Sequence, residues 1–188
     1  QKGTLNIVND VGFMVLSVPV SALQGVDDNA DKKMSNQELV THLESVRQQI
    51  QAGIKISRPK QISVLQIMMI EIASAENSSS TLSEHLVVLG RFDLSSLPIT
   101  QKSLSSYTSD RMVLSYALFG AKKSEQVVDF TITRKSQSQW LHLTPLQSEK
   151  EILPSSFSVF KDYVTTGAHH VLSGADHLLF LLIVLLIC

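Results

Sequence analysis

The sequence predicts a mainly β protein: an antiparallel β-sandwich with one helix, followed by a helix that spans a membrane. Three observations lead to this prediction. Short apolar segments rich in β-branched residues recur between polar breaks such as AENSSSTLSE and SLSSYTSD, which is typical of antiparallel strands joined by turns. One segment has helical spacing instead. The final stretch, LLFLLIVLLIC, contains no polar side chain.

Six segments have the composition of strands. The first contains Pro19, which places it at the edge of a sheet or at a bend, because proline cannot donate a ladder hydrogen bond. The predicted strands are residues 11–23, 62–74, 85–94, 111–120, 127–134 and 139–146.

Residues 35–52 predict the helix of the outer domain. Ser35 is followed three residues later by Glu38, which is the capping-box pattern of a helix start, and Gly53 is a natural stop. The apolar side chains recur in steps of four, three and four residues, at Leu39, Leu43, Val46 and Ile50.

Length and composition exclude several classes of protein. The 188 residues suffice for one ordinary domain and a short appendage. With 16 basic and 17 acidic side chains the formal net charge is -1, so no basic field exists and we expect no nucleic-acid partner. The single cysteine, Cys188, allows neither an internal disulfide nor a cysteine metal cluster.

The C-terminal segment is predicted to be a transmembrane helix. From Gly167 to Cys188 the chain supplies 22 residues, with Asp176 the one formally charged side chain; about 20 apolar residues cross a bilayer. The alternative is a buried C-terminal helix of a soluble domain, but such a helix needs a large surrounding core. We therefore divide the chain into an extracytoplasmic β-rich domain (1–150), a linker and juxtamembrane segment (151–166) and a truncated first transmembrane helix (167–188).

The start of the chain bears on which side of the membrane the domain lies. The opening QKGTLNIVND begins with Gln1 and lacks the apolar core of a signal peptide. A removed leader would explain this start, as would a trimmed chain. With a removed leader, residues 1 to about 160 lie outside the cytoplasm and the C-terminal segment anchors them.

The residues that lead into the predicted helix, DDNADKKMSNQE, resemble an EF-hand calcium loop over residues 27–38. A hard cation such as Ca²⁺ takes six to eight oxygen ligands, which a tight loop delivers from alternating side chains and a backbone carbonyl. The candidate ligands are Asp27, Asn29, Asp31, the carbonyl of Lys33, Ser35 and the terminal carboxylate Glu38.

The loop departs from the motif at its sixth place, where Lys32 stands instead of glycine. A second copy of the motif is also missing from the sequence, and two lysines bring positive charge close to the ion, so we expect weakened affinity. The alternative is an acidic turn followed by a capped helix, with Glu38 serving the cap and no ion bound. A bound Ca²⁺ would act as a structural clip rather than a switch.

Ionisable side chains cluster inside the apolar C-terminal segment: His169, His170, Asp176 and His177. Such groups are costly in a membrane and are functional candidates. The alternative places both leading histidines at the water interface, with Asp176 and His177 satisfying each other or capping backbone. On a straight helix His170 and His177 lie about 10.5 Å apart along the axis, whereas metal ligands lie about 2.0 to 2.2 Å from the ion.

That distance leaves three arrangements open. A break at Gly174 or further helices could complete one metal shell. Otherwise, His170 and His177 would form successive stations on a path for ions or protons.

The stretch GAHHVLSGADHLLFLL, residues 167–182, resembles the signature of HupE/UreJ-type membrane proteins. The matching positions are Gly167, His170, Val171, Leu172, Gly174, Asp176, His177, Leu178, Leu179 and Phe180; His169 is an extra histidine. One branch of this family carries a large extracytoplasmic domain with an EF-hand-like loop. The family is regarded as nickel or cobalt permeases linked to hydrogenase and urease.

The resemblance implies a transition-metal site at His170, Asp176 and His177, with His169 as a further candidate ligand. Imidazole and carboxylate suit Ni²⁺, Co²⁺ or Zn²⁺, and the family favours Ni²⁺. It also implies a bacterial inner-membrane protein with its N-terminal domain in the periplasm.

Two other functions compete with metal handling. In the first, the β-domain is a non-catalytic module or accessory subunit that docks on another membrane or envelope protein, while the tail anchors it in membrane lipid. In the second, His and Asp serve an enzyme near the membrane surface. We expect no enzyme, because the outer domain lacks a nucleophile elbow and a phosphate loop, and its histidines are scattered at His42, His85 and His142.

Overall fold

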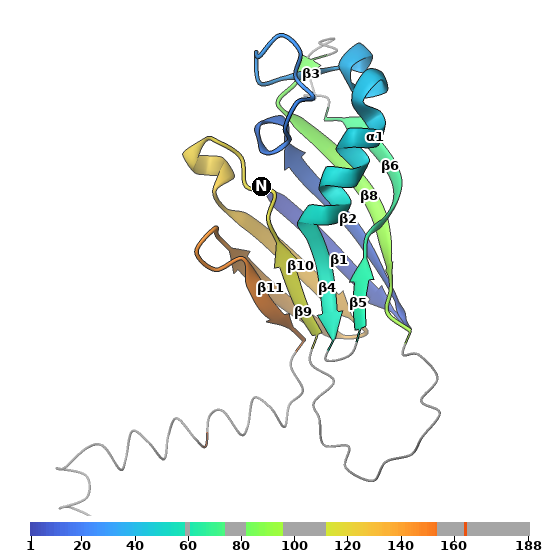
Figure 1. Cartoon of the computed structure of the whole chain (residues 1–188). Coiled ribbons are helices and arrows are strands. Elements are labelled where there is room, and N and C mark those ends of the chain that lie inside the picture. The colour runs from blue at the N-terminus through green and yellow to red at the C-terminus, as the bar shows by residue number, and fades with distance from the viewer. Residues whose placement is uncertain (59–60, 74–81, 96–111, 154–163, 165–188) are drawn as a thin grey trace, which may run out of the picture. The chain divides into compact units, whose positions relative to one another are not determined.

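Two facing β-sheets and a helix make up the part of the chain that the computed structural model describes, residues 1–58, 61–73, 82–95, 112–153 and 164 (Figure 1). The chain divides into two compact units, Gln1–Ser105 with Asp110–Leu153, and Ser106–Ser109 with Pro154–Cys188. All elements given below belong to the first unit. Of the second unit the structure describes Val164, which is helical and exposed.

The larger sheet has six strands in the order β11-β10-β1-β2-β8-β6. Its neighbours pair in antiparallel fashion, except that β1 and β10 run parallel. The strands are β1 (Lys2–Val8), β2 (Val11–Pro19), β6 (Gln66–Ile72), β8 (His85–Asp93), β10 (Val128–Arg134) and β11 (Gln137–Leu143).

The smaller sheet has four antiparallel strands in the order β12-β9-β4-β5. They are β4 (Ile54–Arg58), β5 (Gln61–Val64), β9 (Met112–Tyr116) and β12 (Glu149–Ile152). A separate short ribbon pairs β3 (Met34–Ser35) with β7 (Leu82–Ser83). Two 3-10 helices, η1 (Val20–Ala22) and η2 (Lys123–Glu125), complete the described elements.

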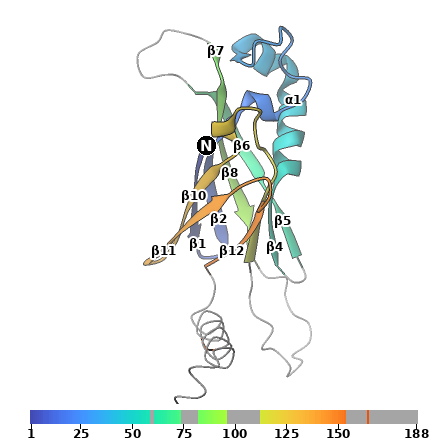
Figure 2. The ribbon, with the colours of Figure 1, turned by 90° about the vertical axis from the view of Figure 1, so that its left-hand side faces the viewer.

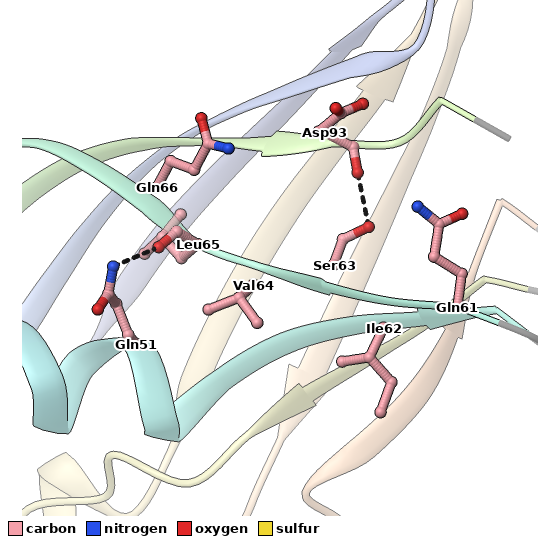
Figure 3. Close-up of a pocket in the computed structure, with 8 residues that line it drawn as sticks. All are labelled: Gln51, Gln61, Ile62, Ser63, Val64, Leu65, Gln66 and Asp93. Carbon is pink, nitrogen blue, oxygen red and sulfur yellow. Dashed lines mark hydrogen bonds between the residues drawn. The ribbon is translucent and has the colours of Figure 1, made fainter. Parts of the chain in front are cut away.

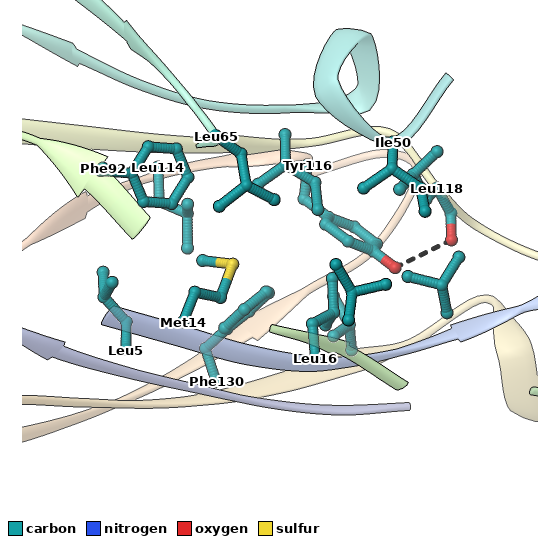
Figure 4. Close-up of a cluster of buried hydrophobic side chains, with 14 of the residues drawn as sticks. Leu5, Met14, Leu16, Ile50, Leu65, Phe92, Leu114, Tyr116, Leu118 and Phe130 are labelled. Atoms are coloured by element: carbon teal, nitrogen blue, oxygen red, sulfur yellow. Dashed lines mark hydrogen bonds between the residues drawn. The ribbon is translucent and has the colours of Figure 1, made fainter. Parts of the chain in front are cut away.

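Buried and exposed side chains alternate along the strands, so one face of each sheet is buried. In β1 every second residue is buried, because successive side chains of a strand point to opposite faces. The core between the sheets therefore takes Leu5, Met14, Phe92 and Leu114, among other buried side chains (Figure 4). Tyr116 lies within this core, and its hydroxyl donates to the Leu118 carbonyl at 2.9 Å.

The helix α1 (Asn36–Gly53) shares a layer with the smaller sheet (Figure 2). Its buried side chains Leu39, Val46 and Ile50 belong to the same core, as the spacing predicted. β4 begins at Ile54, directly after the helix ends at Gly53. The second layer of the sandwich thus consists of α1 and the four-stranded sheet, which α1 enters through β4.

A single stretch of chain joins the two layers at one edge. β5 pairs with β4 in the smaller sheet, and β6 pairs with β8 in the larger one. Leu65 lies between β5 and β6 and is completely buried. The predicted strand of residues 62–74 is therefore wrong in detail, because it is divided where the chain changes sheets.

The mainly β class and the helix over the predicted segment are confirmed. The strand prediction for residues 11–23 is too long, since residues 20–22 form η1. Pro19 is the last residue of β2, and the chain leaves the strand there, so the predicted bend is confirmed. The predicted edge position is wrong, because β2 lies inside the sheet between β1 and β8. The predicted antiparallel sheets are confirmed with one exception among the described strands, the parallel pair β1 and β10.

Candidate functional site

The loop of residues 27–38 is held by its own side chains. The Asp27 carboxylate accepts the backbone N–H of Asp31 at 3.2 Å and of Lys32 at 2.7 Å. Asn29 Oδ1 accepts the Asp31 N–H at 3.0 Å, and Asp31 Oδ1 accepts the Lys33 N–H at 2.7 Å. These are Asx-type turns, in which a short polar side chain folds the backbone around itself.

Two residues of the loop have left-handed backbone. Ala30 has φ 58° and Lys32 has φ 62°, a region that costs an L-residue other than glycine roughly 1–2 kcal/mol. Lys32 occupies the sixth place, where an EF-hand loop has glycine. The backbone at Lys32 is therefore in a region that suits glycine, and the lysine side chain strains it.

The end of the loop is fixed to the rest of the domain. Met34, at the eighth place, is completely buried and pairs with Ser83 in the β3–β7 ribbon. Ser35 follows as the N-cap of α1. The burial of Met34 and the pairing of β3 with β7 thus fix the residue at which α1 starts.

Glu38 is used by the helix cap. Its carboxylate accepts the Ser35 hydroxyl at 2.6 Å, the Ser35 N–H at 2.9 Å and the Asp28 N–H at 3.1 Å. The hydrogen bonds from the Ser35 hydroxyl and N–H, followed by those from the loop backbone, lower the pKa of Glu38 despite its burial. The carboxylate is therefore anionic and faces the loop at neutral pH.

The loop does not gather its acidic groups around one point. Within the described ranges, no group of three or more His, Cys, Asp or Glu side chains is arranged to hold a metal ion. The carboxylates of Asp27, Asp31 and Glu38 each bond to backbone N–H groups instead. The structure thus has the capped helix of the alternative interpretation, preceded by a loop with left-handed backbone at Ala30 and Lys32.

Sequence reasoning missed a contact of His42. Its Nε2 lies 2.9 Å from Asp28 Oδ1, so the helix and the loop are joined by a second polar contact. The side chain of His42 is 22% exposed. The fourteen-residue separation of the two residues gives no local signal for this pair. The other two histidines among the described residues lie in strands, His85 in β8 and His142 in β11.

A groove of about 360 Å³ lies at the edge where the chain changes sheets (Figure 3). The Ser63 hydroxyl donates to the main-chain carbonyl of Asp93 at 2.6 Å and so links β5 to β8. Gln51 Nε2 donates to the Leu65 carbonyl at 3.0 Å. Hydrogen bonds from Ser95 lower the pKa of the Asp93 carboxyl. The groove is lined by Gln51, Gln61, Ile62, Ser63, Val64, Leu65, Gln66 and Asp93. The Ser63 hydroxyl bonds to the main-chain carbonyl of Asp93, not to its carboxylate.

The C-terminal candidates His169, His170, Asp176 and His177 lie outside the described residues. The predicted membrane-spanning segment of residues 167–188 lies outside them as well. Among the residues whose placement is described, no helix combines the length and the apolarity that crossing a membrane requires.

Comparison with known proteins agrees with the motif in the C-terminal segment. No curated protein matches the chain. The family model described as HupE / UreJ protein matches residues 147–188, a range that includes the whole GAHHVLSGADHLLFLL stretch. The resemblance seen in the residues is confirmed by this match, which covers residues 147–188.

Proposed function

We propose that this chain is a membrane-anchored HupE/UreJ-type protein that binds a divalent transition metal, nickel or cobalt, through His170, Asp176 and His177. The observation that carries this proposal is the family match over residues 147–188, which contains all three side chains. The HupE/UreJ family is a membrane family associated with nickel and cobalt transport.

The chemistry of the three side chains supports the proposal. Imidazole nitrogen and carboxylate oxygen are ligands that Ni²⁺ and Co²⁺ accept. Placing them in an apolar segment is expensive unless they meet a partner or an ion. In the proposed arrangement the β-domain lies on the periplasmic side of a bacterial inner membrane and residues 167–188 enter the lipid.

Metal binding by the full chain in detergent micelles tests this proposal. Isothermal titration with Ni²⁺ should give a site that weakens by about tenfold or more in His170→Ala and His177→Ala, a loss of about 1.4 kcal/mol or more. His85→Ala is the matched control, because His85 lies in strand β8 of the β-domain, outside the proposed site. Unchanged affinity in both ligand variants would overturn the proposal.

A second candidate function is docking on another membrane or envelope protein. It is favoured if His170→Ala and His177→Ala leave metal uptake by the intact protein unchanged while the chain co-purifies with a larger membrane assembly. Uptake that depends on the histidines favours metal handling.

We also propose that the loop of residues 27–38 binds Ca²⁺ as a structural clip for the β-domain. The left-handed turn at Lys32 and the anionic Glu38 facing the loop support this role. Binding would require the Asp27, Asp31 and Glu38 oxygens to exchange some backbone hydrogen bonds for the ion. An ion that binds the folded state alone must raise the melting temperature.

The melting temperature of the full chain with and without Ca²⁺ tests the clip. With a dissociation constant of about 10⁻⁴ to 10⁻³ M, which is ordinary for weak sites, about 10 mM Ca²⁺ stabilises by roughly 1.4 to 2.7 kcal/mol. Asp31→Ala should abolish the gain, and Asp10→Ala, at an exposed turn outside the loop, should keep it. No shift at millimolar Ca²⁺ in the unchanged chain would refute the clip.

A further inference from the structure

The larger sheet has an outer face, on the side away from α1 and the smaller sheet (Figure 2). On this face, one row of residues in register crosses all six strands. Each member is the register partner of the next. None of the six carries a formal charge. In spatial order they are Trp140, Thr131, Thr4, Val15, Leu89 and Met69.

This outer face exposes large apolar side chains. Trp140 is 79% exposed, Val15 44% and Met69 39%, and Phe13, next to Val15 on β2, is 42% exposed. An antiparallel sheet with one face in water ordinarily carries polar residues there. Thr131 and Thr4 separate Trp140 from Val15, so the row is uncharged throughout and apolar at both sides. Large apolar side chains gathered on one sheet face favour an interaction site over a solvated one.

Charges of both signs flank the uncharged row. On one side lie Lys2, Glu71 and the pair of His142 with Asp129, whose Nδ1 and Oδ1 atoms are 2.8 Å apart. On the other side lies Arg91. Membranes and nucleic acids select surfaces of one charge sign. A face with both signs around an apolar centre fits a partner that presents the same pattern.

We propose that this face is the interface between two copies of the chain, related by a two-fold axis that runs along the strands between β1 and β2. That axis places β11 over β6, β10 over β8 and β1 over β2 of the second copy. In the uncharged row, Trp140 then faces Met69 of the second copy, an aromatic–sulfur contact of a favourable kind. In the neighbouring row, His142 faces Glu71.

The area of the face suits a stable dimer. Six strands about 4.8 Å apart and about seven residues long present roughly 700 Å². Two copies would bury roughly 1,400 Å² in total, within the range of about 1,200–2,000 Å² that specific interfaces bury. The proposed contact is a sheet-on-sheet packing and does not depend on the C-terminal segment or on a metal.

The oligomeric state of the full chain in detergent, measured by light scattering during size exclusion, tests the interface. Val15→Lys and Trp140→Glu put charges into the uncharged row and should each convert dimer to monomer. Val40→Lys is the matched control, because Val40 is 77% exposed on α1; it should stay dimeric. Melting curves establish that each variant is folded.

Cross-linking tests the two-fold arrangement itself. In a Cys188→Ser background, one tagged copy carries Trp140→Cys and a second carries Met69→Cys. A short bismaleimide should join them, because stacked sheets lie about 10 Å apart. Leu146→Cys with Met69→Cys is the control, since Leu146 is fully exposed at a turn outside the face. A monomeric wild type, a dimer that survives Val15→Lys and Trp140→Glu, or equal yields from both cysteine pairs would overturn the proposal.

Discussion

Ser35 and Glu38 exchange hydrogen bonds at the start of α1. Ser35 Oγ accepts the Glu38 N–H at 3.2 Å, while the Glu38 carboxylate accepts the Ser35 N–H at 2.9 Å. These are also the ninth and twelfth positions of the proposed calcium loop. Helix capping and ion binding therefore use the same atoms, Ser35 Oγ and the Glu38 carboxylate oxygens. A bound ion would have to share these oxygens with the cap.

Ser35→Ala should destabilise the domain by about 1 kcal/mol, within the about 0.5–2 kcal/mol range of N-cap losses. The reason is that the Glu38 N–H and the Glu38 carboxylate each lose the hydroxyl partner. Urea denaturation of the full chain without Ca²⁺ measures the change. Ser45→Ala, on the exposed side of the same helix, is the control and should change the free energy of unfolding by less than about 0.5 kcal/mol. Equal effects of both substitutions would argue against the cap.

The acid side of the stability curve should depend on Glu38. Its pKa is lowered in the folded state, chiefly by the Ser35 hydroxyl, so the unfolded state binds more protons at acidic pH. The stabilisation is complete above the unfolded pKa of about 4.3 and is lost as pH falls through the lower folded pKa. Glu38→Gln should lower stability at neutral pH and flatten its decline below about pH 5.

Denaturation midpoints measured from pH 7 to pH 3 would reveal this slope. Glu44→Gln is the control, because Glu44 is exposed on the same helix and accepts a hydrogen bond from Gln48 four residues away. It should keep the acid slope of the unchanged chain. If Glu38→Gln retains that slope too, the folded-state stabilisation of the Glu38 carboxylate is refuted.

Local signals were enough to predict α1 and its cap, whereas long-range pairing was not predictable from them. The spacing of Leu39, Val46 and Ile50 specifies a buried helix face within a single segment. The parallel pairing of β1 with β10 joins residues more than 120 positions apart. The sequence of neither strand indicates which strand it pairs with. Five described strands were missed, namely β1, β3, β4, β7 and β12. β12 was missed because its sequence EKEI is mostly charged.

Replacing Lys32 by glycine should stabilise the domain. Lys32 has φ 62°, a conformation that glycine adopts at little cost, whereas an L-residue loses roughly 1–2 kcal/mol. Part of this gain is offset by the entropy of glycine in the unfolded chain, so the expected net gain is about 1 kcal/mol or less. Lys33→Gly is the control for removal of one positive charge and should destabilise. A loss of stability in Lys32→Gly would contradict the left-handed turn.

The candidate loop was predictable because its residues are consecutive, whereas the contacts that complete it were not. Asp27, Asn29 and Asp31 recur at every second position, which a reader of the sequence can see. The contact of His42 with Asp28 and the groove between Gln61 and Asp93 depend on how distant segments pack. His170 and His177 were singled out because ionisable groups are costly in an apolar segment, and the family motif then included both; their role stays a prediction.

Gly120→Ala should destabilise the domain by about 1–3 kcal/mol, the usual cost of overpacking. A Cβ there would come within 2.3 Å of Glu125 Oε2 and 2.5 Å of Ser21 Oγ. Glu125 cannot easily move aside, since its Oε2 accepts the Ser21 hydroxyl at 2.6 Å and the Lys122 N–H at 3.0 Å. Burial raises the pKa of Glu125, but these hydrogen bonds outweigh burial and lower it.

A double-mutant cycle separates this clash from a general effect of alanine. In a Glu125→Ala background the carboxylate that meets the new Cβ is gone, so Gly120→Ala should cost clearly less than in the unchanged chain. Contacting residues give coupling energies of roughly 0.5–3 kcal/mol in such cycles. Urea denaturation of the four proteins measures the coupling. Additive losses would mean that Glu125 is not what Gly120 accommodates, because two independent defects sum while a shared contact can be lost only once.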